Sequence, residues 1–340
     1  MALVLSNEYI EPAELTGYVR EALADRAENA FGLSTYLPNT NVDDIDFRAA
    51  IGGGGLNRAA SYRAYDAESP ISGRTGIQRI QGELPPISEK RILGEYDRLK
   101  MRKLDNGIRN AILNDAVELA TAIQTRLEIA RGELLADGKV TISENGLDGL
   151  VADFGRNPAH TATAATLWSA GGDPVADMLA WQATYVATNG VRPGIALTSQ
   201  NVLSALMRNE AIRNYTLPAG STQQIVTVDA INALFNSFGL PSLSVYEAQV
   251  AGEDGKAKSI IDPNKIIFLP SAGQKIGETL WGVTAEALDA DYAIDATEAP
   301  GIVVGSYSDK DPVSLWTKAS AIALPIAPNA NLTFSATVLG

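Results

Sequence analysis

The longest regular pattern of hydrophobic and polar positions in the chain runs from residue 104 to residue 137. Apolar side chains recur there every three or four residues, which places them along one face of an α-helix. The stripe comprises Ile108, Ile112, Ala116, Leu119, Ile123, Leu127, Ala130 and Leu134. Charged residues, Glu128 and Arg131 among them, are expected on the other faces, and Asp137-Gly138 is expected to end the helix.

Such a helix would be about 50 Å long at 1.5 Å per residue, so an extended element must lie against it. A coiled coil is the alternative reading, but no second stretch of comparable length exists for it to pair with. A sheet is the better partner, because strand-like patterns return near the end of the chain. They are found at residues 301–307, 314–317, 320–324 and 332–338.

Upstream of this helix, the pattern predicts a helix from Pro12 to Ala30, a glycine hinge and a two-stranded arm. The hinge is Gly52, Gly53, Gly54 and Gly55, and it lacks the Gly-Lys-Ser/Thr sequence of a phosphate-binding loop. Residues 58–66 and 76–83 alternate as strands do, with a turn-rich tip between them. The arm has too few apolar residues to be stable alone and should need a partner surface. The arm is also basic, because residues 57–82 contain four arginines and only two acidic residues. The arginines are Arg58, Arg63, Arg74 and Arg79.

Residues 88–101, just before the long helix, are predicted to form a charged lead-in to it. Downstream of the helix, the pattern changes to a mixture of helices and strands. A hairpin is expected from residue 139, with Asn145-Gly146 in a tight turn. From Asp173-Pro174 onward, helices alternate with strands at 194–198, 243–246 and 265–269, with Ser199 as a helix cap and a further helix at 227–238. This texture predicts a compact α/β region.

Composition narrows the classes of function. The 340 residues contain no cysteine, which excludes disulfides and thiolate metal sites, and a single histidine, His160, which excludes histidine-rich zinc sites. The net charge of -13 argues against a surface that grips nucleic acid. No apolar run approaches the ~20 residues of a membrane span, and no basic segment marks a signal peptide at the N-terminus.

Candidate chemistry is limited to two acidic clusters and His160. Asp43, Asp44 and Asp46 lack the glycine and glutamate of an EF-hand, so a solvated turn is favoured over a cation site. Another cluster, Asp289, Asp291, Asp295 and Glu298, could serve as a metal or acid/base site, but nothing near it in the sequence would separate the pKa values of these carboxylates. A solvated acidic loop is favoured there, and a packing or surface role is favoured for His160.

Several motifs carry a resemblance to a known family. They are Gly73-Arg74-Thr75-Gly76, the run from Gly82 to Lys90, and Trp168 followed by Asp173-Pro174. With the order of elements, these residues resemble the major capsid proteins of tailed bacteriophages, the lambda-like major capsid protein E family with the Hong Kong 97-type fold. The resemblance covers nearly the whole chain. It implies an α+β fold and a protein without catalytic activity, cofactor or metal.

The resemblance also implies a division of the chain into parts. Residues 1–50 would be the N-terminal arm, 51–90 the extended loop, and 91–169 the peripheral domain with the long helix as its spine. Residues 170–300 would be the axial domain, and 301–340 would return to the peripheral domain. The arm arginines would contact a neighbouring subunit, and the four glycines would let the loop swing.

The implied function is self-assembly into hexamers and pentamers of an icosahedral head around double-stranded DNA, with expansion on maturation, in the cytoplasm of a host bacterium. Expected partners are other copies, a scaffolding protein, a portal and, unless non-covalent packing reinforces the shell, a decoration protein. DNA would lie nearby without specific contacts. Some relatives join subunits through a lysine of the loop, but residues 1–89 here contain none. Two alternatives stay open: an encapsulin-like compartment, and a metal-dependent hydrolase using Asp289, Asp291 and Asp295.

Overall fold

The chain divides into two compact units, each assembled from three separate stretches of sequence. The computed structural model describes residues 4–25, 31–51, 78–104, 106–144, 146–147, 149–218, 223, 225–252, 255–295 and 298–340. The first unit comprises Met1–Phe47, Gln81–Arg131 and Glu278–Ile326. The second comprises Arg48–Ile80, Gly132–Gly277 and Ala327–Gly340.

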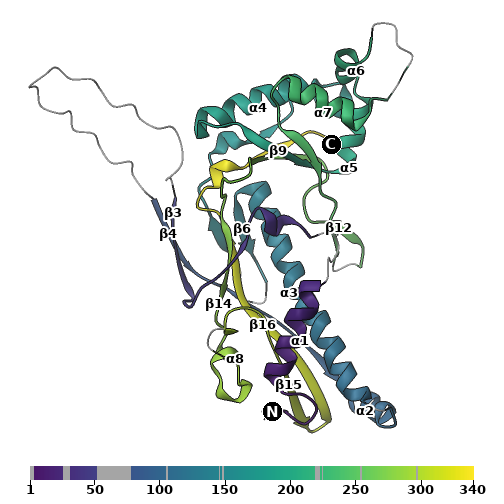
Figure 1. Cartoon of the computed structure of the whole chain (residues 1–340), viewed down its shortest axis with the longest axis vertical. Helices are drawn as coiled ribbons and strands as arrows, with labels where there is room; N and C mark the ends of the chain where they lie inside the picture. Colours follow the sequence, from purple (N-terminus) through teal and green to yellow (C-terminus); the bar gives the residue numbers. More distant parts are fainter. Residues whose placement is uncertain are drawn as a thin grey trace, which may run out of the picture. The chain divides into compact units, whose positions relative to one another are not determined.

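The first unit is a six-stranded sheet with helices along one face (Figure 1). Its strands are β1 (Val4–Leu5), β2 (Asn39–Asn41), β5 (Pro86–Leu93), β14 (Glu278–Gly282), β15 (Val303–Lys310) and β16 (Val313–Ile326). Its helical elements are α1 (Pro12–Asp25), η2 (Leu33–Thr35), α2 (Glu95–Met101), the long α3 (Gly107–Asp137) as far as Arg131, α8 (Ala285–Leu288) and η5 (Ala290–Tyr292).

Strand β16 is the centre of this sheet, because three strands pair with it. The whole of β15 runs antiparallel along one edge, from Val303 opposite Ser320 to Lys310 opposite Val313. β5 and β14 share the other edge in succession, with β5 beside residues 315–322 and β14 beside residues 322–326. The stretches expected as two strands at 314–317 and 320–324 are therefore one strand of 14 residues.

The apolar stripe of α3 packs on this sheet, as the sequence predicted. The core contains Ile112, Ala116, Leu119, Ile123 and Leu127 together with Leu315, Ala319, Ala321 and Ala323 of β16. Small alanines on the strand let the helix approach closely, and α1 fills the adjoining space with Leu15, Val19 and Leu23. Ile108 lies at the partly buried edge of this core, and Leu134, beyond the first unit's boundary, is also buried.

The ends of the two helices follow local chemistry. Gly138 follows α3 with φ +72°, and its N–H donates to Leu134 O at 2.9 Å, which stops the helix as expected. Helix α1 is described from Pro12 to Asp25, and the remainder of the predicted helix, residues 26–30, lies outside the described part of the chain. The N-terminal residues expected as a separate arm belong to the first unit, because α1 is buried in its core.

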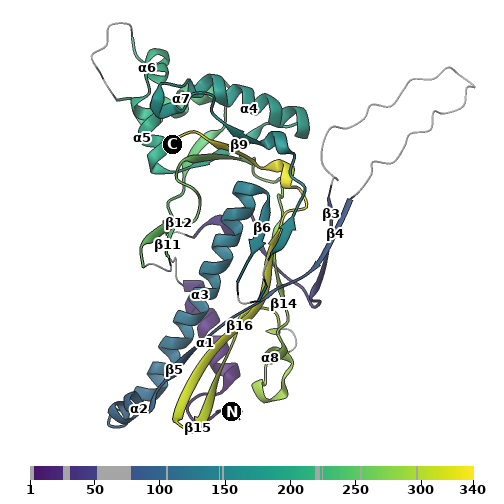
Figure 2. The same ribbon diagram turned by 180° about the vertical axis from the view of Figure 1, so that it is seen from behind.

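The second unit is a five-stranded mixed sheet with helices packed on it (Figure 2). The strand order is β10 (Ser242–Val245), β9 (Pro193–Thr198), β13 (Lys265–Pro270), β17 (Phe334–Thr337) and β8 (Thr161–Thr163). The helical elements are η3 (Pro158–His160), η4 (Trp168–Ala170), α4 (Pro174–Asn189), α5 (Gln200–Arg208), α6 (Glu210–Thr216), α7 (Val228–Ser237) and η7 (Ala330–Leu332). Two hairpins complete it, β6 (Lys139–Ile142) with β7 (Leu150–Asp153) and β11 (Gln249–Ala251) with β12 (Ala257–Ser259).

Side-chain caps explain why α4, α5 and α7 of the second unit begin where the sequence predicted. Asp173 accepts from the N–H groups of Val175 and Ala176 at the start of α4. Ser199 caps α5 and Thr227 caps α7 in the same way. Asn209 caps α6, and its side-chain amide also donates to the carbonyls of Trp168 and Gly172, so one residue orders two turns.

Besides the single strand β16, three elements differ from the prediction. The sequence predicts a charged lead-in at residues 88–101, whereas residues 86–93 form the strand β5. The exposed side chains of β5 hide the alternating pattern of a strand. The hairpin of β6 and β7 is present, but residues 143–149 separate its strands, so its connection is longer than a tight turn. β17 pairs with β13 and β8 in the second unit, and so does not return with β15 and β16 to the first.

Candidate functional site

Most of the predicted arm lies outside the described residues. This applies to the hinge glycines Gly52, Gly53, Gly54 and Gly55, to the expected strand at 58–66, and to Arg58, Arg63 and Arg74. Arg79 lies in β4 (Gln78–Glu83), but its side chain is outside the description. The second expected strand of the arm, residues 76–83, thus overlaps β4, whose partner is β3 (Asp46–Ile51).

The end of β4 leads into the motif from Gly82 to Lys90. A Cβ at Gly82 would lie 2.9 Å from the ring of Phe47, so glycine gives that buried ring its space. Leu84 follows, buried, with its N–H donating to Ile45 O at 2.8 Å. Strand β5 then pairs with β16, and Lys90 Nζ lies 4.7 Å from the ring centroid of Trp316. The motif is therefore the junction that joins β4 to the sheet.

Opposite charges fix β5 against α3. Arg91 donates to Asp115 Oδ1 at 3.0 Å and also to Glu118, both on the long helix. These acids hold the pKa of the Arg91 guanidinium above its usual value through their hydrogen bonds. The pairs are partly exposed, so they add more to register than to stability.

A buried ion pair, Glu128 with Arg131, joins α3 to the N-terminal segment of the first unit. Only 1% of Glu128 and 7% of Arg131 is exposed. Arg131 Nη1 donates to Glu128 Oε2 at 3.1 Å, Nε donates to Thr279 Oγ1 at 2.9 Å, and Nη2 donates to Asn39 Oδ1 at 2.6 Å. Glu128 Oε1 accepts from Leu33 N at 2.9 Å. We call Glu128, Arg131, Thr279, Asn39 and Leu33 the buried anchor.

The buried anchor binds two neighbouring strands, β14 and the edge strand β2, to the helix. Thr279 belongs to β14 and donates to Leu37 O at 3.0 Å, and β2 runs parallel to β14 from Asn39 opposite Thr279. Buried charges need such partners, because an unpaired one costs several kcal/mol. Sequence reasoning placed Glu128 and Arg131 on the solvent faces. Their opposite charges three residues apart were the available signal, but only the fold shows that they are covered.

The candidate acidic clusters have structural roles among the described residues. Asp44 Oδ1 accepts from Asp46 N at 3.3 Å, which is a turn. Asp289 caps η5 by accepting from Asp291 N at 3.0 Å, and Arg20 Nη1 donates to the backbone carbonyl of Glu298 at 2.7 Å. In the part of the chain that the structure describes, no three acidic or histidine side chains are placed to hold a metal ion.

Glu286 lies in α8, just before this acidic segment, and is paired with the sheet. Lys318 Nζ and Ser320 Oγ donate to its Oε1 at 2.6 and 2.9 Å. Burial alone would raise the pKa of this carboxyl, but these hydrogen bonds outweigh it and hold the pKa below its usual value. The pair stabilises α8 against β16.

His160 is fully buried in the second unit, so of the two roles expected for it, surface or packing, the structure shows packing. Its Nδ1 lies 3.0 Å from Thr333 O and its Nε2 lies 3.0 Å from Thr188 Oγ1, while the ring stacks on Tyr185. Burial lowers the pKa of His160, and the positive charge of Arg156 lowers it further, against the hydrogen bond to Thr333 O. The neutral ring is a core side chain with both nitrogens satisfied.

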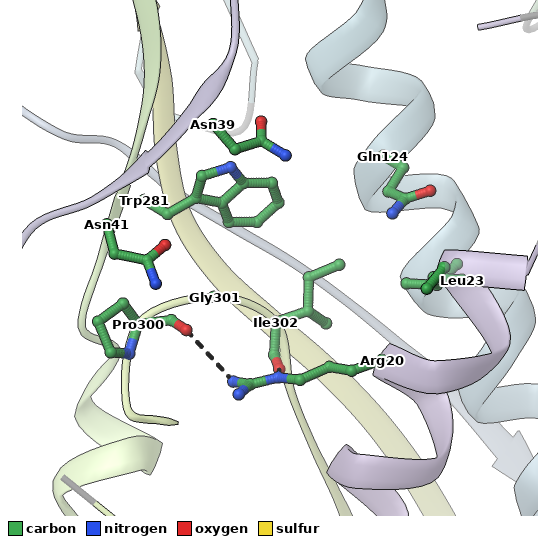
Figure 3. A pocket seen from close by; sticks show the side chains of 10 residues that line it. Arg20, Leu23, Asn39, Asn41, Gln124, Trp281, Pro300, Gly301 and Ile302 are labelled. Carbon is green, nitrogen blue, oxygen red and sulfur yellow. Dashed lines mark hydrogen bonds between the residues drawn. The ribbon is translucent and has the colours of Figure 1, made fainter. Parts of the chain in front are cut away.

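A cavity of about 380 Å³ lies in the first unit between α1, α3 and the sheet (Figure 3). Its lining combines the apolar side chains of Leu23 and Ile302 with the amides of Asn39, Asn41 and Gln124. Arg20 donates to the carbonyls of Ile302 and Pro300 at its rim. We assign it no ligand.

No helix among the described residues is both long enough and apolar enough to cross a membrane. The described part of the first unit thus contains a buried anchor, a long helix packed on a sheet, and the junction between β4 and that sheet.

Comparison with known proteins agrees with this geometry. The chain is similar to the protein assigned as the capsid protein of a prophage of Escherichia coli CFT073, with 15% identity, a TM-score of 0.61, and 97% of this chain and 99% of that chain covered. It is also similar to a phage-related protein from Bordetella bronchiseptica RB50, with 14% identity, a TM-score of 0.56, and 99% and 98% covered. No match was found among curated proteins.

These similarities confirm the predicted α+β fold of the Hong Kong 97 type. A sequence profile of the family described as phage major capsid protein E matches residues 52–338, which is most of the chain. The chain therefore belongs to the phage major capsid protein E family and is a capsid shell protein.

Proposed function

We propose that this chain is the subunit of an icosahedral phage head and that it assembles into hexamers and pentamers around double-stranded DNA. The observation that carries the proposal is the family match over residues 52–338, which includes α3, β16 and all five strands of the second unit's main sheet. Assembly would take place in the cytoplasm of the host bacterium, with a separate scaffolding protein and a portal as partners, followed by expansion. A decoration protein or non-covalent packing would reinforce the shell, since no lysine precedes Lys90 to form a covalent link from the loop.

The experiment is electron microscopy of the purified full chain, expressed alone and together with the neighbouring viral genes. Rings of five and six subunits or closed shells are expected. A uniform small oligomer under every condition would contradict the proposal. Shells that hold protein in place of DNA, when made in infected cells, would point to an encapsulin-like compartment.

The parts named from the family resemblance belong to the same proposal. The first unit, with α3 as the spine, corresponds best to the peripheral domain, and the second unit, with its five-stranded sheet, to the axial domain. The basic arm would lie on the acidic surface of a neighbouring subunit. Residues 171–300 support this, because they contain fourteen acids and seven basic residues, a balance of -7.

The arm arginines can be tested by a matched pair of variants. Changing Arg58, Arg63, Arg74 and Arg79 together to glutamate should abolish rings and shells, because the arm would then repel the acidic neighbour. Changing the same four residues to lysine keeps the charge and should retain assembly. Equal assembly by both variants would show that the charge of the arm is not used.

The glycine hinge predicts a different defect. Replacing Gly53 and Gly54 with alanine restricts the backbone, so shells should form but remain at their initial diameter when expansion is triggered. Particle diameter in electron micrographs measures this. Normal expansion of the variant shells would contradict a hinge at residues 52–55.

A further inference from the structure

The segment around α2 exposes a group of large apolar side chains that its own unit does not cover. They are Ile92, Tyr96, Leu99 and Leu104, with Val313 at the start of β16, and we call them the α2 surface. Tyr96 is 67% exposed and Leu99 is 56% exposed. β5 ends with Leu93 opposite Leu315, so α2 and Val313 lie at the same end of the sheet (Figure 1).

Helix α2 is too short to be stable on its own. It has seven residues and none of them is buried, whereas isolated helices below about 12–15 residues are marginal in water. Only Arg98 and Met101 turn inward far enough to be half-buried. A helix with so little packing of its own indicates a partner that covers its other side.

The exposed side of α2 has an apolar centre and charged edges. Tyr96 and Leu99 are three residues apart, so they are neighbours on the helix surface. Lys100 Nζ lies 4.5 Å from the ring centroid of Tyr96, which places the lysine along one edge. At 100° per residue, Asp97 lies on the same side as Lys100 but further round the helix from the apolar centre, and Glu95 shares the opposite edge with Arg102 just after the helix.

This charge order is complementary to itself when two copies of α2 run antiparallel. Centred on residues 98 and 99, such a pair places Glu95 level with the partner's Arg102, and Asp97 level with the partner's Lys100. In an antiparallel pair the same edges face each other, so both levels join opposite charges. A parallel pair would join like charges at each level. Within the described part of the chain, the ion pairs all involve other side chains.

We propose that α2 is a two-fold contact between subunits, in which the α2 surface of one copy packs antiparallel on that of a second copy. This inference rests on the proposed assembly into a shell and assigns one of its contacts. Tyr96 and Leu99 form the apolar centre, with the two charge pairs on either side of it. An isologous contact of this kind is the ordinary geometry of a two-fold interface.

The absence of cysteine from the chain makes a crosslinking test clean. In assembled particles of Leu99→Cys, residue 99 of one copy lies beside residue 99 of the next. A short bismaleimide should join them, because packed helix axes lie about 8–10 Å apart. The control is Leu288→Cys, which is 76% exposed in the same unit and outside the α2 surface. A dimer band on a denaturing gel from the first variant alone is the expected result, and its absence overturns the proposal.

Charge reversal tests the antiparallel direction. Two variants, E95K/D97K and K100E/R102E, each place like charges at both levels and should weaken each contact about tenfold or more. Mixing the two variants restores opposite charges at every level, so shells should form from the mixture and not from either variant alone. A mixture that assembles no better than its components overturns the antiparallel pair.

Wild-type protein separates this inference from the proposed function. If wild-type chains form no rings or shells, the assembly proposal itself fails. If they form shells but Leu99→Cys gives no dimer, and Y96D/L99D assembles as well as wild type, only the α2 contact fails. A band that joins Leu99→Cys to a different co-expressed protein also overturns it, because the occupant would not be a second copy.

Discussion

Removing Arg131 should destabilise the first unit more than removing any exposed arginine of α3. In Arg131→Met, the aliphatic part of the side chain is kept and the guanidinium is lost. Glu128, of which 1% is exposed, then loses the guanidinium that donates to its Oε2, while the N–H of Leu33 still donates to its Oε1. Asn39 Oδ1 and Thr279 Oγ1 lose donors as well. Breaking one partner out of a buried pair costs about 3–5 kcal/mol, so we expect a loss in that range.

The matched control is Arg109→Met on the same helix. Arg109 Nη2 donates to Glu14 Oε1 at 2.7 Å, but the two side chains are 40% and 59% exposed. Exposed pairs contribute about 0–1 kcal/mol, so this variant should lose little. A third variant, E128L/R131M, removes both charges and should recover part of the loss, because replacing both members of a buried ion pair with apolar side chains costs less than removing one of them.

The assay is urea unfolding of the unassembled chain at one protein concentration, followed by tryptophan fluorescence. The order of the midpoints should be wild type and Arg109→Met together, then E128L/R131M, then Arg131→Met. If Arg131→Met unfolds at the same urea concentration as Arg109→Met, the buried anchor does not hold the N-terminal segment, and the reasoning from burial is refuted.

Three further predictions concern the packing of both units. Gly172→Ala should lower the free energy of unfolding by about 1–3 kcal/mol, because the new Cβ would lie 2.1 Å from Thr166 O. Gly17→Ala meets nothing within 4 Å and should stabilise α1 by about 0.5–1 kcal/mol. Thermal unfolding compares the two variants, and equal effects on the melting temperature would contradict this reasoning. The lowered pKa of His160 predicts that stability is unaffected above the unfolded-state pKa of about 6.5 and falls as pH drops below it. His160→Gln should reduce this loss between about pH 6.5 and 5, and an unchanged pH profile of the melting temperature would refute the assignment. Asp173→Ala removes the cap of α4 and should cost about 1 kcal/mol, with Asp173→Asn, which keeps an acceptor, as the control that should remain near wild type.

Several elements could be read from the sequence because their signals are local. The stripe of α3 has a period that only a helix satisfies, and Asp173, Ser199 and Thr227 cap the helices that they precede. The strands at β9 and β13 also follow from short apolar runs. In each case the information lies within a few residues of the element that it predicts.

The elements that were missed depend on distant parts of the chain. β5 reads as charged because its strand character comes from pairing with β16, more than two hundred residues later in the sequence, and from the pairing of Arg91 with α3. β17 follows β16 in the chain yet pairs in the other unit, since strand order is set by register and core packing rather than by sequence order.

The sequence by itself determined the long helix, the need for an extended surface beneath it, the absence of cysteine chemistry and, through its motifs, the capsid family. Only the tertiary structure decided which charges are buried and which apolar residues are not. Glu128 and Arg131 look like surface residues until the segment around residues 33–39 covers them, whereas the large apolar side chains of Tyr96 and Leu99 lie exposed on α2. The physical reason is that burial is a property of the neighbours brought by the fold, and local hydrophobicity reports it only when those neighbours are close in sequence.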